Sequence, residues 1–192
     1  MILLVLTSIV GLAFIVERGL ALRWDKVIPP RVQEAVEIGV PERLAELKQI
    51  CEEQPSTLSR LLLVAQEHLH QPRDENVDVI QTRARHEVVQ LERGLVVLEI
   101  VVGIAPLLGL VGTIHGLITL FGDIGRAGLA DNTVLAKGIA IALNTTLMGL
   151  LIAIPSLVAW SYFSKKVDTL AVEMETLCQE FLRRHYRARK KT

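Results

Sequence analysis

Threonine hydroxyls lie near the middle of two apolar segments that are each long enough to cross a bilayer. Thr113 lies in GLVGTIHG, and Thr145 and Thr146 lie in NTTLMGL. A hydroxyl both donates and accepts hydrogen bonds without carrying a charge, so it can hold water or a carboxylic acid in either protonation state inside a membrane. These threonines are therefore candidates for lining a proton or ion pathway.

Small residues share a helical face with each of these threonines, at intervals of three and four positions. They are Pro106, Gly109 and Gly116 with Thr113, and Ala142 and Gly149 with Thr146. Two interpretations stay open. The glycines permit close packing between helices, where a threonine often bonds its own backbone. Alternatively, each smooth stripe faces a pore or a ligand.

Other polar side chains lie in the same segments. His115 comes two residues after Thr113, so on a helix it points about 200° away and cannot share that face. We interpret His115 as structural or interfacial, with a functional role as the alternative. Glu99 lies near one end of its segment and is interpreted as an interfacial or paired carboxylate rather than a proton relay. Asn144 is interpreted as an interhelical hydrogen-bonding residue.

Motifs for other chemistry are missing from the sequence. It has no Walker A loop, no H-E-x-x-H and no G-x-S-x-G, and Cys51 and Cys178 lack the spacing of a metal or redox site. The 21 basic residues balance the 21 acidic ones, so no net charge favours nucleic acid as a partner. We therefore expect no enzyme, no metal and no cofactor.

The composition predicts helices in a membrane, since 51% of the residues are hydrophobic but only 4% are aromatic. Apolar blocks at residues 1–22, 95–121 and 134–163 each meet the length of about 20 residues that a spanning helix needs. The first block lacks a basic n-region and a cleavage site, so we expect a retained helix rather than a signal peptide. The predicted fold is an all-α integral membrane protein with three transmembrane helices.

Charged helical segments connect and follow the spans. Residues 23–94 have helical periodicity interrupted by prolines, and we expect the part from Glu75 to Gly94 to continue into the second span as one long helix. Residues 122–133 form a short link, and residues 164–192 form an amphipathic tail. The apolar stripe of the tail consists of Leu170, Met174, Leu177 and Phe181.

Basic residues predict the orientation in the membrane. Lysines and arginines gather in the tail and just after the first span, whereas the link carries only Arg126. Cytoplasmic flanks of membrane helices carry the excess of Lys and Arg. We therefore expect a periplasmic amino terminus and link, and a cytoplasmic loop and tail.

Two segments carry a family resemblance. APLLGLVGTIHGLITLF from Ala105 to Phe121 and GIAIALNTTLMGLLIAIPS from Gly138 to Ser156 resemble the paired signatures of the ExbB/TolQ/MotA proton-channel family, closest to its ExbB and TolQ branch. The order of spans and loops is similar too. The resemblance implies a bacterial inner-membrane protein whose long helices extend into the cytoplasm and which assembles as a ring, with a homopentamer expected.

The resemblance also implies partners and a motor function. An ExbD- or TolR-like partner with one membrane helix would lie inside the ring, and its aspartate would take up and release protons. The threonines that face it in the family correspond to Thr113 and Thr146, with Thr145 beside them. The proton motive force would then energise outer-membrane transport or envelope maintenance through a TonB-like or Pal-linked envelope protein.

One position departs from the family pattern. ExbB-like members commonly have a glutamate where this chain has Ile141. A non-conducting structural membrane scaffold, whose glycine and threonine faces only pack helices, is therefore an alternative. A sodium-driven member of the same family is another, because the choice of proton over sodium rests on the resemblance alone.

Overall fold

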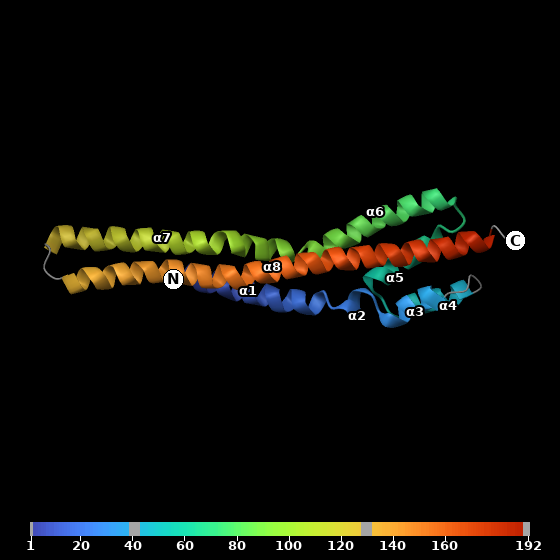
Figure 1. Cartoon of the computed structure of the whole chain (residues 1–192), viewed down its shortest axis with the longest axis horizontal. Coiled ribbons are helices and arrows are strands. Elements are labelled where there is room, and N and C mark those ends of the chain that lie inside the picture. Colours follow the sequence, from blue (N-terminus) through green and yellow to red (C-terminus); the bar gives the residue numbers. More distant parts are fainter. Residues whose placement is uncertain (1, 39–42, 128–131, 190–192) are drawn as a thin grey trace. The chain divides into compact units, whose positions relative to one another are not determined.

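The structure is a computed structural model that describes residues 2–38, 43–127 and 132–189 (Figure 1). All of its elements in these residues are helices, which confirms the all-α prediction for this part of the chain. They are α1 (Ile2–Ala21), α2 (Trp24–Val27), α3 (Pro30–Ile38), α4 (Leu44–Glu53), α5 (Thr57–Glu67), α6 (Arg73–Glu92), α7 (Leu95–Ala127) and α8 (Asn132–Arg189).

The helices form two compact units. Residues 1–18 and 94–162 make up the first, here called the span unit. Residues 19–93 and 163–192 make up the second, here called the charged-helix unit. Helix α8 contributes residues to both units.

Three helices are long and apolar enough to cross a membrane: Ile2–Ala21, Leu95–Gly125 and Leu135–Arg187. Among the described residues, these helices overlap the three apolar blocks at 1–22, 95–121 and 134–163 almost completely, which agrees with the three predicted spans. A ring of copies is not part of this single-chain structure.

Helix boundaries differ from the expected ones in three places. Helix α6 ends at Glu92 and α7 begins at Leu95, so a turn at Arg93 and Gly94 divides the long helix that was expected. At Gly94 a Cβ atom would lie 2.3 Å from Nε of Arg18, so the Arg18 side chain would have to move to admit any larger residue. Residues 122–127 of the expected link belong to α7, because an isolated glycine costs a helix only about 1 kcal/mol. Residues 128–131 of that link lie outside the described residues.

Helix α8 accounts for the third difference. It is one helix of 58 residues that contains both the third candidate span and the tail. The sequence between Phe163 and Leu170 contains no glycine or proline that would end a helix, so the change from apolar to amphipathic composition leaves the backbone unaltered.

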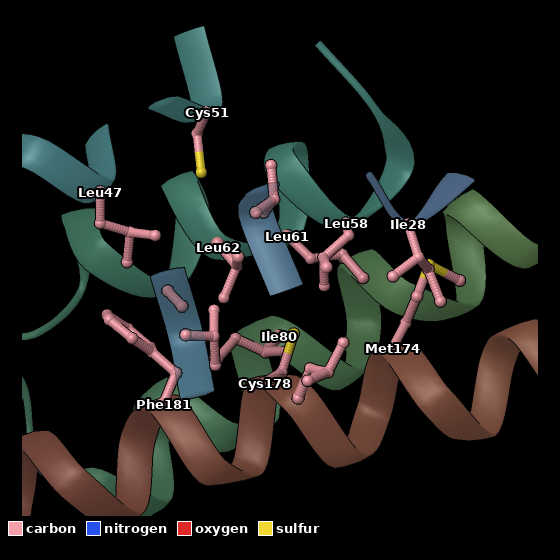
Figure 2. Packing of buried hydrophobic residues seen from close by; sticks show 14 of the residues in the cluster. Ile28, Leu47, Cys51, Leu58, Leu61, Leu62, Ile80, Met174, Cys178 and Phe181 are labelled. Carbon is pink, nitrogen blue, oxygen red and sulfur yellow. The ribbon is translucent and has the colours of Figure 1, made fainter. Parts of the chain in front are cut away.

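Apolar side chains from α2 to α6 and from the end of α8 form the core of the charged-helix unit (Figure 2). The stripe predicted on the tail is confirmed as buried, with Leu170 at 0% and Met174 at 1% exposure. These side chains pack in one cluster with Leu58 and Leu61 of α5. The tail therefore supplies part of this core.

Cys51 of α4 and Cys178 of α8 lie in the same core (Figure 2). Burial raises the pKa of Cys51 to about 11 and that of Cys178 to about 12. Because the thiolate is the reactive form of cysteine, both residues serve as small packing groups.

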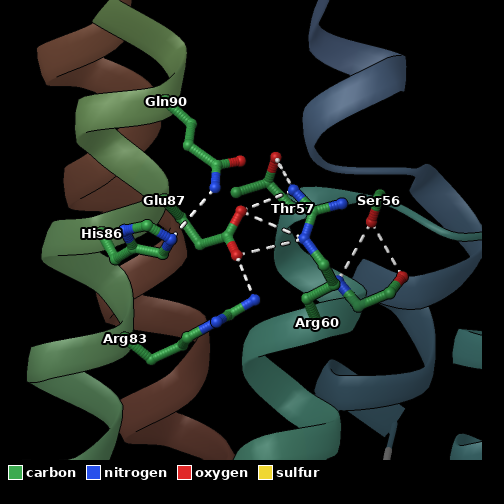
Figure 3. A network of polar contacts seen from close by, with 8 residues as sticks. Ser56, Thr57, Arg60, Arg83, His86, Glu87 and Gln90 are labelled. Atoms are coloured by element: carbon green, nitrogen blue, oxygen red, sulfur yellow. Dashed lines mark hydrogen bonds and ion pairs between the residues drawn. The ribbon is translucent and has the colours of Figure 1, made fainter.

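A buried carboxylate joins α5 and α6 (Figure 3). Glu87 is 1% exposed, and its oxygens accept hydrogen bonds from Nε and Nη2 of Arg60 at 3.1 and 2.5 Å. Nη2 of Arg83 pairs with the same carboxylate at 2.9 Å. Burial disfavours the charge, but the hydrogen bonds and charge of Arg60, together with the charge of Arg83, outweigh it and hold the pKa of Glu87 below its usual value.

We expect the substitution Glu87→Gln to lower the stability of the purified protein near neutral pH by about 2 kcal/mol, the typical cost of losing charged hydrogen bonds. Because the pKa of Glu87 is lowered by folding, its contribution is present above the unfolded pKa of about 4.3 and is lost as the pH falls through the folded value. Thermal unfolding followed by circular dichroism from pH 7 to pH 3 would measure both effects.

The variant should therefore show a weaker loss of stability with acid than the wild-type chain. Glu92→Gln is the matched control, because Glu92 is an exposed acid at the end of the same helix. Identical acid profiles for Glu87→Gln and the wild-type chain would contradict the role of this ion pair.

Candidate functional site

Helices α7 and α8 lie side by side in the span unit, and glycines let their backbones touch (Figure 1). A Cβ atom at Gly149 would lie 2.6 Å from the carbonyl oxygen of Ala105. One at Gly109 would lie 2.9 Å from the carbonyl oxygen of Thr145. Since the obstacle at both positions is backbone, neither site has room for a side chain unless the helices separate.

The two small-residue stripes face each other across this contact. Besides Gly109 and Gly149, a Cβ atom at Gly116 would lie 3.1 Å from the Cβ of Ala142. Pro106 is half-buried inside α7. The three glycines and Ala142 thus take part in packing between α7 and α8 within the chain, which is compatible with the packing interpretation. A pore-wall role for them stays a prediction.

The threonines meet where the two stripes are closest. Oγ1 of Thr113 is in hydrogen-bond contact with Oγ1 of Thr146 and lies 3.3 Å from Oγ1 of Thr145. The sequence predicts Thr113 and Thr146 on comparable faces of two helices, and in the structure the two residues are direct partners. Thr145, the third candidate, belongs to the same cluster.

Backbone carbonyl oxygens complete this threonine cluster of Thr113, Thr145 and Thr146. The Thr145 hydroxyl donates to the carbonyl oxygen of Ala142 at 2.7 Å. All three hydroxyl oxygens lie 3.2 to 3.3 Å from the carbonyl oxygen of Gly109. These acceptors were not predicted, because every residue has a backbone carbonyl group. Only the glycine, which lets another helix approach, indicates where such a group is accessible.

The cluster offers more acceptors than donors. Each hydroxyl has one hydrogen but several oxygens within reach, so its donor and acceptor roles can exchange by rotation of the hydroxyl. No member carries a charge, which keeps the cost of the cluster in a membrane low. The arrangement can therefore bind a polar or titrating group without titrating itself.

One side of the cluster is left uncovered by α1. A Cβ atom at Gly11 of α1 would lie 3.3 Å from both Val101 of α7 and Ser156 of α8. Helix α1 therefore packs on the side of the α7–α8 pair that carries Val101 and Ser156. Around α7, Thr113 points about 120° away from Val101 at 100° per residue. The side chains of the cluster are half-buried in the single chain. A partner can thus reach Thr113 from the side opposite α1.

The remaining predicted polar residues lie outside the cluster. Glu99, His115 and Asn144 are exposed in the single chain. Their side chains form no hydrogen bond or ion pair with the described residues. Ile141, at the position of the family departure, is 61% exposed. Within the described ranges no group of side chains has the composition of a metal site.

The helices and the threonine cluster define a membrane protein with a polar contact between two of its candidate spans. Residues 53–176 match the MotA/TolQ/ExbB proton channel family, and the chain belongs to this family. The matched range includes the whole of α7 and all members of the threonine cluster. The family prediction is therefore confirmed.

Several curated proteins are similar to this chain in sequence. The ExbB-like 1 biopolymer transport protein of Synechocystis sp. is 32% identical over 193 residues, which cover 92% of this chain and 74% of that protein. Biopolymer transport protein exbB1 of Vibrio cholerae is 33% identical over 139 residues, covering 70% of this chain and 60% of that protein. Biopolymer transport protein ExbB of Helicobacter pylori is 35% identical over 83 residues, or 43% and 57% of the two chains.

We expect Gly149→Ala to destabilise the span unit, because its Cβ atom would meet the carbonyl oxygen of Ala105 at 2.6 Å. Forcing extra volume into a close contact typically costs about 1 to 3 kcal/mol. The measurement is thermal unfolding of the purified chain in detergent.

Gly103→Ala is the matched control, since a Cβ atom at Gly103 of α7 would have nothing within 4 Å. This variant makes the same chemical change in a helix interior and should be neutral or slightly stabilising. Equal melting temperatures for the two variants would show that the close approach of α7 and α8 does not limit stability.

Proposed function

We propose that this chain is the channel subunit of a proton-driven motor in a bacterial inner membrane. Copies of it would form a ring, with a pentamer expected, around the membrane helices of an ExbD- or TolR-like partner. Proton flow would energise outer-membrane transport or envelope maintenance through a TonB-like or Pal-linked protein. The observation that carries this proposal is the uncharged threonine cluster between two candidate spans of a proton-channel family member.

The distribution of charge supports one orientation. Basic residues are concentrated in the last part of α8 and near the end of α1, and short segments rich in Lys and Arg stay in the cytoplasm. The charged-helix unit would therefore lie in the cytoplasm. The amino terminus and the segment between α7 and α8 would face the periplasm.

The chemistry of the cluster fits a titrating carboxyl group on the partner. A threonine hydroxyl can donate to a carboxylate and accept from a carboxylic acid, so it can accommodate both states of a proton carrier. A hydroxyl that turns toward the partner leaves behind carbonyl groups that retain their own helical hydrogen bonds. Each proton that crosses releases about 2.3 kcal/mol per 100 mV of membrane potential.

Two alternatives have support of their own. The glycine stripes and all cluster hydroxyls have partners within the chain, which is what a structural scaffold without conduction requires. A sodium-driven channel would also suit hydroxyl and carbonyl oxygens, because these are hard ligands. The same flux experiment separates both alternatives from the proton channel.

We expect Thr113→Val and Thr146→Val to reduce proton flux by about tenfold, because losing one hydrogen bond to a charged group costs about 1.5 kcal/mol. Valine keeps the shape of threonine, so assembly should be unchanged. The measurement is acidification of liposomes that contain the chain and its co-purified single-span partner, together with the size of the complex.

Thr119→Val is the matched control. Thr119 lies on the same helix, is exposed, and donates only to the carbonyl oxygen of His115 at 3.0 Å. Wild-type flux in both cluster variants would favour the scaffold. Flux that follows an imposed sodium gradient and ignores a pH gradient would favour the sodium-driven channel.

A further inference from the structure

His115 of α7 and Asn144 of α8 are polar, exposed and outside the threonine cluster. Both lie within candidate spans, far from the ends of their helices. An amide or imidazole that faces lipid hydrocarbon without a hydrogen bond is costly. Each of these side chains therefore requires a polar partner beyond its own chain.

The two side chains lie at the same depth in the helix pair. Gly112 of α7 lies opposite Thr145 of α8, and Gly116 lies opposite Ala142. His115 falls between the two glycines, and Asn144 falls between Ala142 and Thr145. With a rise of 1.5 Å per residue, their levels along the pair differ by no more than about 3 Å.

They point to opposite flanks of the pair. At 100° per residue, His115 is about 120° around α7 from Gly109, which faces α8. Asn144 is about 140° around α8 from Gly149, which faces α7. A single chain therefore cannot bring the two side chains together.

Although they point away from each other, both side chains also point partly toward the side of the pair on which α1 packs. His115 lies about 40° around α7 from Val101, which contacts α1. Asn144 lies about 40° around α8 from Met148, which lines an apolar recess of about 380 Å³ together with residues of α1. Two copies placed side by side thus present His115 and Asn144 to each other at one depth and on one side.

We propose that copies of this chain dock with α7 of one against α8 of the next, and that His115 of one copy hydrogen-bonds Asn144 of its neighbour. A neutral imidazole has one donor and one acceptor, and the amide has both, so the pair can form in either tautomer without a charge. The contact joins two different surfaces, so it repeats in one rotational direction and can close into a ring. The inference deepens the proposed function, because it rests on an assembly of copies and names the contact that fixes their register.

Cross-linking between two differently tagged copies tests this contact. One copy carries His115→Cys and the other carries Asn144→Cys, and the native Cys51 and Cys178 stay in place because both are buried. Oxidation in native membranes should produce a disulfide-linked dimer that carries both tags. The depth control replaces Asn144→Cys by Leu151→Cys, an exposed position on the same side of α8 about 10 Å further along.

We expect the 115–144 pair to form at least about tenfold more mixed dimer than the 115–151 pair, since only the first brings the sulfurs within bonding distance. Equal yields from both pairs would overturn the inference. So would a dominant dimer between two 115 positions, which would indicate a two-fold contact.

A second measurement needs no cysteine. His115→Leu and Asn144→Leu should each weaken assembly about threefold to tenfold, measured as the dilution at which the detergent-solubilised complex dissociates. The complex of the double variant should assemble no more weakly than that of either single variant, because all three variants remove the same hydrogen bond. Independent, additive losses would overturn the inference.

Failure of this inference is distinguishable from failure of the proposed function. Thr113→Val should leave the 115–144 cross-link intact, because Thr113 lies on a different face of α7. A normal cross-link with no proton flux in any variant would contradict the proposed channel function and support the interface. Normal flux without the cross-link would contradict only the inferred interface.

Discussion

The contact of two backbones at Gly109 and Gly149 is the constraint on which the span unit depends. It brings α7 and α8 so close that hydroxyls on one helix reach carbonyl oxygens on the other, at 3.0 Å from Thr113 to Ala142. At an ordinary helix separation of 8 to 10 Å, larger side chains would fill the contact and each threonine would bond only its own helix. The same contact fixes the register of the pair, and with it the depth of every polar residue on either helix.

Charge is distributed unequally between the two units. The span unit meets its polar needs in the α7–α8 contact with hydroxyl and carbonyl groups, whereas the charged-helix unit buries Glu87 against two arginines. A carboxylate in the threonine cluster would need a permanent counter-charge in a membrane, while a hydroxyl needs none. If the chain conducts protons as proposed, the group that titrates therefore belongs to the partner, and this chain supplies a surface that tolerates both of its states.

Periodicity predicted those features of the fold that depend on one face of one helix. The apolar stripe from Leu170 to Phe181 is buried as expected, and all three candidate spans lie where the apolar blocks placed them. Features that depend on contacts between two helices were harder to predict from the sequence. A stripe of glycine and threonine is equally suited to contact with another helix of the same chain and to a place on a pore wall. Hydropathy does not reveal which of these surfaces the stripe contacts. For the same reason the hydrogen bonds of Thr145 and the acceptors on Gly109 and Ala142 could not be predicted. The turn at Arg93 and Gly94 was not predicted either.

The crowding of three hydroxyls around the carbonyl oxygen of Gly109 has a consequence for the direction of the hydrogen bonds. Three hydrogens distributed over a larger number of acceptors allow several arrangements of similar energy, as in ice, where the oxygens are ordered and the hydrogens are not. Each arrangement gives the cluster a dipole of a different orientation. Reversing that dipole requires only rotations about C–O bonds, which are fast on the scale of any helix motion. The α7–α8 contact thus combines a rigid set of heavy atoms with a polarity that an approaching charge can reset.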